Sequence, residues 1–169
     1  MPAVFSSSAI RTITPADLPR ILAIQAASYP AHLLEDEATF LSKLQFAGKC
    51  SWLIEQNGQV LGYLFTHPWH GDTPPALNRA EQAWPSEADR FYLHDLAIHP
   101  DGRGLNLSRL LSEHALNWAR QQGYSQAMLV AVGDAQTFWQ KMGFSVAAKQ
   151  DAALQQYGQA VLMLRDLSQ

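Results

Sequence analysis

The stretch FYLHDLAIHP (91–100), followed at once by DGRGLNLS (101–108), decides how the rest of this chain is interpreted. Its first ten residues are mostly apolar and predict a strand, and the next eight predict a polar turn that leads into a helix. At a helix start, backbone N–H groups without partners and the positive end of the helix dipole converge on one point. The segment therefore predicts a site for an anionic group such as a phosphate.

The turn at 101–108 matches neither of two common phosphate-binding motifs. It lacks the Gly-Lys-Ser/Thr ending of a P-loop, and Gly102 and Gly104 do not have the spacing of a dinucleotide fingerprint. Glycine nevertheless lets backbone amides approach an anion closely, and Arg103 adds a charge-assisted contact. Taken alone, the turn is equally compatible with an ordinary helix entry.

The sequence on both sides of this segment predicts an α/β protein with a mixed sheet, in the order β-α-α-β-β-β-α-β-α-β-β. Asn57-Gly58 is a strong hairpin signal, and the segment from Thr14 to Asp17 has the form of a capping box. A long loop is expected from Pro68 to Asp89. Strands are predicted at 10–14, 50–55, 59–67, 91–98, 127–132, 144–148 and 159–165. Helices are predicted on apolar stripes that begin at Leu18, Phe40 and Leu107, and from Asp134 to Met142.

Composition favours one domain over residues 1–169, because 47% of the chain is hydrophobic and 16% is charged. The net charge of −3 argues against a nucleic-acid partner, for which a basic surface is expected. Cys50 is the single cysteine, so no disulfide forms within the chain, and we expect a plain buried thiol. Neither a signal peptide nor an apolar stretch of spanning length is visible, which predicts a cytoplasmic protein without a membrane partner.

Two motifs and the order of the elements resemble the GNAT superfamily, the N-acetyltransferases that use acetyl-CoA. In that family a strand leads to Arg-x-x-Gly-x-Gly/Ala at a helix start, where this chain has RGLNLS (103–108). Further along, the family carries Ala-x-x-Leu-Tyr-x-x-x-Gly-Phe, which AQTFWQKMGF (135–144) matches in spacing. The resemblance implies a GNAT-like mixed sheet of about seven strands flanked by about four helices, with a splayed strand pair forming the acetyl-CoA cleft.

The resemblance also implies which residues hold acetyl-CoA as the co-substrate. Backbone amides of the turn would bind the pyrophosphate, and the preceding strand would pair with the pantetheine arm. One amide of that strand would polarise the thioester carbonyl, as oxyanion donors do. The implied residues are Leu96, Ala97, Ile98, Arg103, Gly104, Leu105, Asn106, Leu107, Ser108 and Phe138.

The chain departs from the family pattern at four positions. Asn106 and Ser108 replace the two small residues of the turn, although Asn tolerates left-handed backbone better than most residues. Trp139 stands where the family's aromatic general acid is often Tyr, and Val132 where it often has Asn. Tyr157 is a candidate replacement for the missing phenol, because the connection between the last two strands often reaches the acceptor site in the family.

His94 and Asp95 are the candidate bases. An amine acceptor arrives protonated and must lose a proton before it attacks the thioester, and family members often place a carboxylate at one of these positions. An unperturbed histidine titrates near ~6.5, whereas an aspartate needs burial to raise its pKa. Neighbouring residues of a strand point to opposite faces, so we expect only one in the cleft unless a bulge intervenes.

The acceptor side is predicted between the first two helices, whose connection borders the acceptor pocket in GNAT proteins. Tyr29, His32, Glu35 and Asp36 lie there, and carboxylates bind cationic amines well. The alternative is that the acidic run 35–37 caps the second helix and supplies its first turn.

Trp69 and Trp84 lie in the long loop and either pack it down or close over a substrate, and packing is favoured. His67 and His70 have no third ligand at a sensible spacing, so no metal is expected.

The sequence thus predicts transfer of an acetyl group from acetyl-CoA to a primary amine of a small molecule or peptide, by direct nucleophilic attack. The alternative is a binding or sensing module that keeps the fold with an impaired cofactor site. The identity of the acceptor does not follow from the sequence, and the edge strands of the C-terminal hairpin are compatible with a homodimer.

Overall fold

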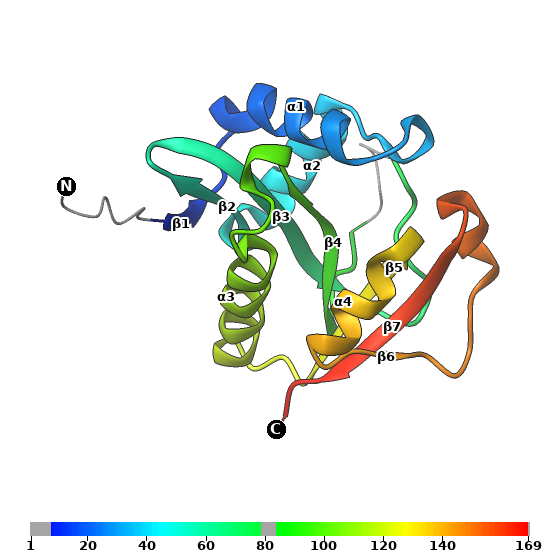
Figure 1. The fold of residues 1–169 in the computed structure, drawn as a ribbon. Coiled ribbons are helices and arrows are strands. Elements are labelled where there is room, and N and C mark those ends of the chain that lie inside the picture. Colours follow the sequence, from blue (N-terminus) through cyan, green and yellow to red (C-terminus); the bar gives the residue numbers. More distant parts are fainter. Residues whose placement is uncertain (1–7, 79–83, 169) are drawn as a thin grey trace.

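The computed structural model describes residues 8–78 and 84–168, which form one open mixed sheet of seven strands with four α-helices (Figure 1). The predicted order of elements is confirmed. In chain order they are β1 (Ser8–Thr12), α1 (Leu18–Ser28), α2 (Glu37–Ala47), β2 (Ser51–Gln56), β3 (Gln59–Trp69), β4 (Arg90–Ile98), α3 (Leu107–Gln121), β5 (Gln126–Val132), α4 (Gln136–Lys141), β6 (Ser145–Val146) and β7 (Ala160–Asp166).

The strand order across the sheet is β1-β2-β3-β4-β5-β7-β6. The first four strands are antiparallel neighbours, β4 and β5 are parallel, and β7 lies antiparallel between β5 and β6. The parallel pair is the one that α3 connects, as expected for a strand–turn–helix unit. The mixed sheet predicted from the sequence is therefore present.

Helices cover both faces of the sheet (Figure 1). On one face Ile21, Ile24 and Phe40 of α1 and α2 pack against Leu53 and Phe65. On the other face the apolar stripe of α3 and part of α4 pack on β2 to β5, in a second buried cluster. Each of these helices buries one apolar side against the sheet, which explains why apolar residues recur about every 3.6 positions in the sequence.

Two local predictions are confirmed in detail. Thr14 and Asp17 form the capping box at the start of a short 3-10 turn, Pro15–Asp17, which continues into α1. Asn57 and Gly58 have φ angles of 53° and 78°, which are the positive values that the hairpin turn between β2 and β3 requires.

Some boundaries differ from the prediction. β3 runs on to Trp69, so the long connection starts two residues later than expected, and β1 starts and ends two residues earlier. β6 is only two residues long, and beyond it the amide of Ala147 donates to the carbonyl of Leu162 at 2.9 Å, while the side chain of Gln150 accepts from the amide of Leu162 at 2.8 Å.

No helix within the described residues has the length and apolar character needed to cross a bilayer.

Candidate functional site

A bulge in β4 brings two neighbouring side chains to the same cavity. Phe65 pairs with Asp95 and Thr66 pairs with Leu93, so His94 is an extra residue in the β3–β4 ladder. Such a bulge breaks the alternation of faces and re-aims side chains. Both His94 and Asp95 line one small cavity of about 50 Å³ at the centre of the sheet. The sequence analysis allowed both His94 and Asp95 to face the cleft only if a bulge lies between them, and the structure has this bulge.

The strands β4 and β5 separate beyond this point. They pair only through Phe91–Leu93 and Ala127–Leu129, and past these residues a cavity of about 270 Å³ lies between them. Its lining includes Leu96, Val130 and Phe138. The splayed strand pair expected from the sequence is thus present, and it leaves one edge of β4 open.

The turn after β4 forms an open groove of about 420 Å³. Gly104 and Asn106 have φ angles of 79° and 63°, so the asparagine adopts the left-handed conformation that a glycine would take. Gly102 has a different role, because a Cβ there would lie 2.9 Å from Leu107 and 3.0 Å from Ile98. One glycine therefore permits close packing under the turn, and the turn is not sealed by its own side chains.

The open edge of β4 presents backbone groups to the cleft. The amide of His99 donates to the carbonyl of Leu61 of β3 at 2.7 Å, and hydrogen-bonded positions alternate along the strand, so the peptide groups of Leu96 and Ile98 point away from β3. The Tyr29 hydroxyl donates to the carbonyl of Leu96 at 2.5 Å, and that of Ser28 to the carbonyl of Ile98 at 3.4 Å. Side chains from the end of α1 thus occupy these two carbonyls, and amides remain as the groups with which this edge can bind a ligand.

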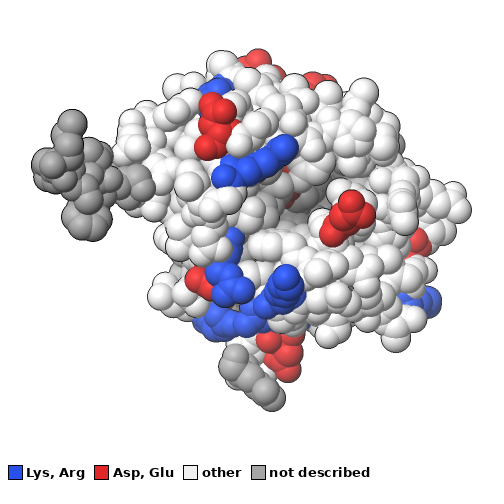
Figure 2. Space-filling view, in the orientation of Figure 1, with Lys and Arg blue, Asp and Glu red and all other residues white. Residues whose placement is uncertain are grey.

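Cationic side chains gather beside this groove. Figure 2 shows a hollow in the face that carries α3 and α4, with Lys and Arg side chains clustered below it. A second groove of about 260 Å³ between these helices adjoins the first through Arg109 and is lined by Arg120, Lys141 and Arg165, with one carboxylate, Glu113. Repulsion from Arg120 adds to burial in lowering the pKa of Arg165. This surface favours an anionic ligand.

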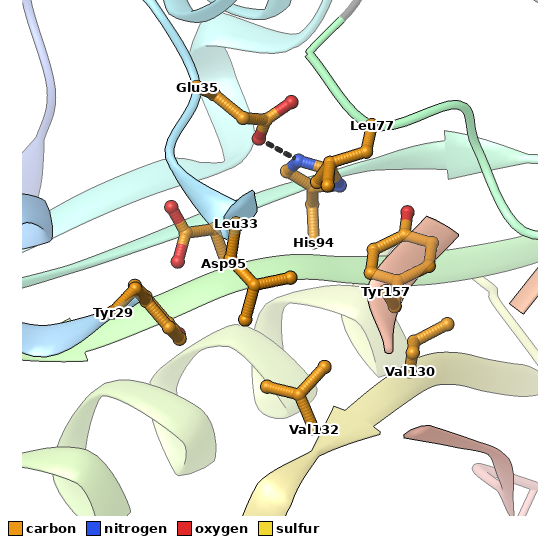
Figure 3. Close-up of a pocket in the computed structure, with 9 residues that line it drawn as sticks. All are labelled: Tyr29, Leu33, Glu35, Leu77, His94, Asp95, Val130, Val132 and Tyr157. Atoms are coloured by element: carbon orange, nitrogen blue, oxygen red, sulfur yellow. Dashed lines mark hydrogen bonds and ion pairs between the residues drawn. The ribbon is translucent and has the colours of Figure 1, made fainter. Parts of the chain in front are cut away.

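Glu35 fixes the ring of His94. The carboxylate Oε1 is hydrogen-bonded to His94 Nε2 (Figure 3). Both side chains are only 2% exposed. A carboxylate only accepts, so Nε2 carries a proton in this contact. Nδ1 is buried and has no hydrogen-bond partner in the part of the chain that the structure describes. The arrangement fixes the orientation of the His94 ring, with Nδ1 as the nitrogen that Glu35 does not contact.

The sequence analysis considered Glu35 as a carboxylate that binds a cationic amine. In the structure both of its oxygens already have partners, so it is not free for this role. Its second oxygen accepts from the amide of Asn78 at 2.8 Å and lies 3.5 Å from the ammonium of Lys43. Gln25 holds the backbone of Glu35 through two hydrogen bonds, of 2.9 and 2.8 Å. Burial alone would raise the pKa of Glu35, but His94, Lys43 and the Asn78 amide bring it down to about 2.

Asp95 lies on the other side of the same cavity. Its Oδ2 accepts from the hydroxyl of Tyr63 at 2.8 Å. Burial, with a smaller contribution from the charge of Glu35, raises the pKa of Asp95 to about 6, against the lowering effect of the Tyr63 hydrogen bond. The carboxylate is therefore ionised at neutral pH, and it retains acceptor capacity for an amine.

Two further predicted residues, Tyr29 and Tyr157, line this cavity. In the view of Figure 3, Tyr29 and Asp95 are on one side of His94 and Tyr157 is on the other. Tyr29 and Tyr157 also line a neighbouring cavity of about 320 Å³ together with His32. Burial raises the pKa of Tyr157, whose hydroxyl donates to the carbonyl of Pro75 at 2.7 Å.

Two substrate-binding predictions find no support in the geometry. Asp36 caps α2 by accepting from the amide and hydroxyl of Thr39, so the helix-capping alternative describes it correctly. Trp69 donates to the carbonyl of Thr73 and packs against a buried cluster, which is the packing alternative. Trp84 likewise stacks on Phe46, with ring centroids 4.3 Å apart. Asp36 and Trp69 thus hold loops in place through polar groups that are already used, and Trp84 does so through its ring.

Cys50 is buried and lies apart from the cavity. Burial raises the pKa of its thiol to about 11, and Sγ donates to the carbonyl of Ala47. Within residues 8–78 and 84–168, no three His, Cys, Asp or Glu side chains gather in a way that could hold a metal ion.

Comparison with known proteins agrees with this geometry. A family model described as "Acetyltransferase (GNAT) family" matches residues 18–144. The chain belongs to the GNAT acetyltransferase family. The chain is 29% identical to N-acetyltransferase 8F1 of Mus musculus over 136 residues, which is 77% of this chain and 56% of the relative. The chain spans about half the length of the curated relatives it matches.

Solved structures show the same fold at low identity. The loading GNATL domain of CurA from Lyngbya majuscula has a TM-score of 0.78 at 13% identity, over 95% of this chain and 98% of that one. Naa50 of Arabidopsis thaliana, in complex with the bisubstrate analogue CoA-Ac-MVNAL, has a TM-score of 0.70 at 15% identity. The match covers 95% of this chain and 99% of that one. The GNAT fold implied by the sequence motifs is thus confirmed.

The two departures from the GNAT motif in α4 and β5 lie at the cleft. Trp139 is 7% exposed and lines the cavity between β4 and β5, and Val132 lines all three cavities around His94. An indole cannot supply the phenolic proton, and a valine supplies no hydrogen bond. In this GNAT protein, polar chemistry at the cleft is therefore concentrated on the side of β4 and Glu35.

Sequence reasoning missed Lys43 and Tyr63. Lys43 had a signal, because it falls at the inward spacing of α2 together with Phe40, Leu44 and Ala47. A lysine on such a stripe predicts a buried counter-charge. Tyr63 had no signal, since an aromatic residue on a buried strand is most often plain core.

Proposed function

We propose that this GNAT protein is an N-acetyltransferase that moves the acetyl group of acetyl-CoA to a primary amine of a small molecule or peptide. The proposal depends on one observation. The cleft between β4 and β5 runs from the open turn at the start of α3, which it adjoins at Ser108 and Phe138, to the residues His94 and Asp95. A ligand with phosphates at one end and a reactive group at the other fits this path.

In this proposal, backbone amides from Arg103 to Ser108 bind the pyrophosphate and Arg103 adds a charge. The amides of Leu96 and Ile98 on the open edge of β4 bind the pantetheine arm, and Phe138 lines its channel. One strand amide is the donor that polarises the thioester carbonyl.

His94 Nδ1 takes the proton of the bound ammonium, and Asp95 orients it by accepting a hydrogen bond. The neutral amine then attacks the thioester carbonyl, so that a C–N bond forms and the C–S bond breaks. The sulfur leaves as a thiolate, which is stable near neutral pH because an ordinary thiol has a pKa of ~8.5. Transfer therefore does not require a phenol at Trp139. The buried thiol of Cys50 gives no support to a covalent intermediate.

The acceptor enters beside α1 in this proposal. The cavities of about 50 and 320 Å³ adjoin, because they share four lining residues, Tyr29, Leu33, Val132 and Tyr157. These side chains suit an apolar group next to the amine. Naa50, a structural neighbour, was solved with an analogue that contains the peptide MVNAL, which makes peptide α-amines a class to include in tests.

The proposed activity is tested by CoA release. Purified protein is incubated with acetyl-CoA and a panel of primary amines: the peptide MVNAL, single amino acids, polyamines and an aminoglycoside. Release of CoA thiol and an acetylated product of +42 Da with at least one amine is expected. Hydrolysis alone, or no turnover with any amine at millimolar concentration, would refute the proposal.

Acetyl-CoA is expected to stabilise the folded protein. At a hundred times its Kd, a ligand that binds only the native state adds about 2.7 kcal/mol to the free energy of unfolding. For a chain of this size, that corresponds to a rise in Tm of about 5–10 °C. Thermal melts with and without 1 mM acetyl-CoA measure the shift. Adenosine is the control, and an unchanged Tm with acetyl-CoA would count against an intact cofactor groove.

The alternative function is a binding or sensing module with an impaired turn, and Asn106→Gly separates the two. Asn106 already has the left-handed φ of 63°, so a glycine there needs no new backbone conformation. We expect the Kd for acetyl-CoA, measured by calorimetry, to stay within about twofold of the wild type. Tighter binding by tenfold or more would mean that the asparagine side chain obstructs the pyrophosphate.

A further inference from the structure

The buried group around His94 contains a charge that the proposed reaction does not use. Lys43 lies on the inward face of α2, and its side chain is 1% exposed. Lysine is almost never fully buried unless it is paired, because taking an ammonium out of water costs several kcal/mol. Its only ion-pair partner among the described residues is Glu35, at 3.5 Å. The fold therefore maintains a costly cation next to the partner of the proposed base.

We propose that Lys43 is a positioning residue that keeps His94 neutral and ready to accept a proton, by supplying the positive charge that balances Glu35. This inference rests on the proposed function, in which His94 is the base. It goes further by assigning the protonation state of His94 to a residue that does not touch the substrate.

The two carboxylate oxygens of Glu35 contact different partners. Oε1 holds His94 Nε2–H, whereas Oε2 faces Lys43 and the amide of Asn78. A buried carboxylate without another counter-ion would draw a second proton onto the imidazole, because opposite charges a few ångströms apart stabilise each other. With Lys43 present, the ion pair is neutral as a unit, and a second cation on His94 would be repelled by the ammonium. Nδ1 then keeps its lone pair.

Other titratable groups surround the ring of His94 and also influence its protonation. Asp95 follows His94 in β4 and favours a proton on the ring, and His67 of β3 has its ring centroid 5.9 Å from that of His94. Burial lowers the pKa of His67 well below its ordinary value, so His67 is neutral. Tyr92 and Tyr157 also face the ring, and burial raises the pKa of both, so they are neutral. Lys43 is therefore the cation that opposes protonation of His94 in this set.

The inference is tested by titrating His94 in the Lys43→Met variant. The Cε1–H NMR signal of His94, assigned through His94→Gln, is followed from pH 5 to 9 in the protein without ligand. In Lys43→Met, the pKa of His94 is expected to rise by about one unit or more relative to the wild type. Lys43→Arg, which keeps the charge, is expected to restore the wild-type titration. Lys49→Met makes the same chemical change at an exposed position nearby and is expected to shift nothing.

Two further measurements keep the inference falsifiable. If Lys43→Met does not fold, Lys43→Gln takes its place, because an amide can still donate to Glu35 without carrying a charge. The acidic limb of kcat/KM, measured with whichever amine is acetylated, should move to higher pH by the same amount as the NMR titration. A folded variant whose His94 titrates within about 0.3 units of the wild type overturns the inference. Absence of turnover in the wild type overturns only the proposed function, since the NMR titration needs no substrate.

Discussion

Replacing His94 with glutamine is expected to lower kcat/KM for acetyl transfer by about 10²–10⁴-fold at pH 7.5, the range found for removing a general base. Glutamine has a similar volume and can still donate to Glu35, but it has no nitrogen that accepts a proton. The ammonium of the acceptor then keeps its proton, and only the small neutral fraction in solution reacts. Steady-state release of CoA measures the effect, with an acceptor from the amine panel.

The matched control for this variant is His70→Gln. The side chain of His70 is 66% exposed and lines none of the cavities around His94, so its kinetics should equal those of the wild type. A second control is a higher pH. The variant should regain activity there, because a larger fraction of the acceptor ammonium loses its proton in solution without a base on the enzyme. If His94→Gln keeps more than about a third of the wild-type kcat/KM, the base is a different group and Asp95 is the next to test.

Replacing Asp95 with asparagine is expected to make the fold more stable at neutral pH. The folded protein raises the pKa of Asp95 from 3.8 to about 6, mainly through burial, so its proton is held more tightly in the folded state. The resulting stability is fully present below pH ~4 and is lost as the pH rises through about 6. At pH 7 the ionised carboxylate costs about 2–3 kcal/mol, whereas asparagine still accepts from Tyr63 without a buried charge.

Thermal melts at pH 4, 5, 6 and 7 test this. The Tm of Asp95→Asn minus that of the wild type should grow with pH and reach about 5–10 °C at pH 7, for a domain of this size. Asp134→Asn, at an exposed carboxylate, should show a difference that does not change with pH. A difference for Asp95→Asn that is flat or falls with pH would show that Asp95 is not strained by burial. A gain in stability with a loss in kcat would be typical of a functional side chain.

Local spacing was enough to predict the fold. The capping box at Thr14, the turn at Asn57-Gly58 and the stripe of α3 each involve residues within a few positions of one another, so backbone geometry determines their outcome. The anion turn was predicted for the same reason, since strand, turn and helix start are contiguous. The GNAT family assignment follows from two such local motifs at the right separation.

Predictions about single side chains were less accurate where a contact from far along the chain decides the role. Glu35 was left open between substrate binding and the first turn of α2, but it contacts His94, 59 residues away, and the Asn78 amide, 43 residues away. For its neighbour Asp36, the sequence left substrate binding and helix capping open. The hydrogen bond from the amide of Thr39 shows that Asp36 caps α2. Adjacent acids in one loop thus differ because packing directs one inward and leaves the other at the helix end.

By itself, the sequence determined the order of elements, the open turn at the start of α3 and the strand that precedes it, because these depend on periodicity and on residues close in the chain. Only the tertiary structure decided that β4 carries a bulge at His94, that Glu35 and Lys43 lie behind its ring, and that Tyr63 holds Asp95. These depend on the register between strands and on a helix packed against them. Both are set by the burial of the whole core, for which no short segment carries a signal.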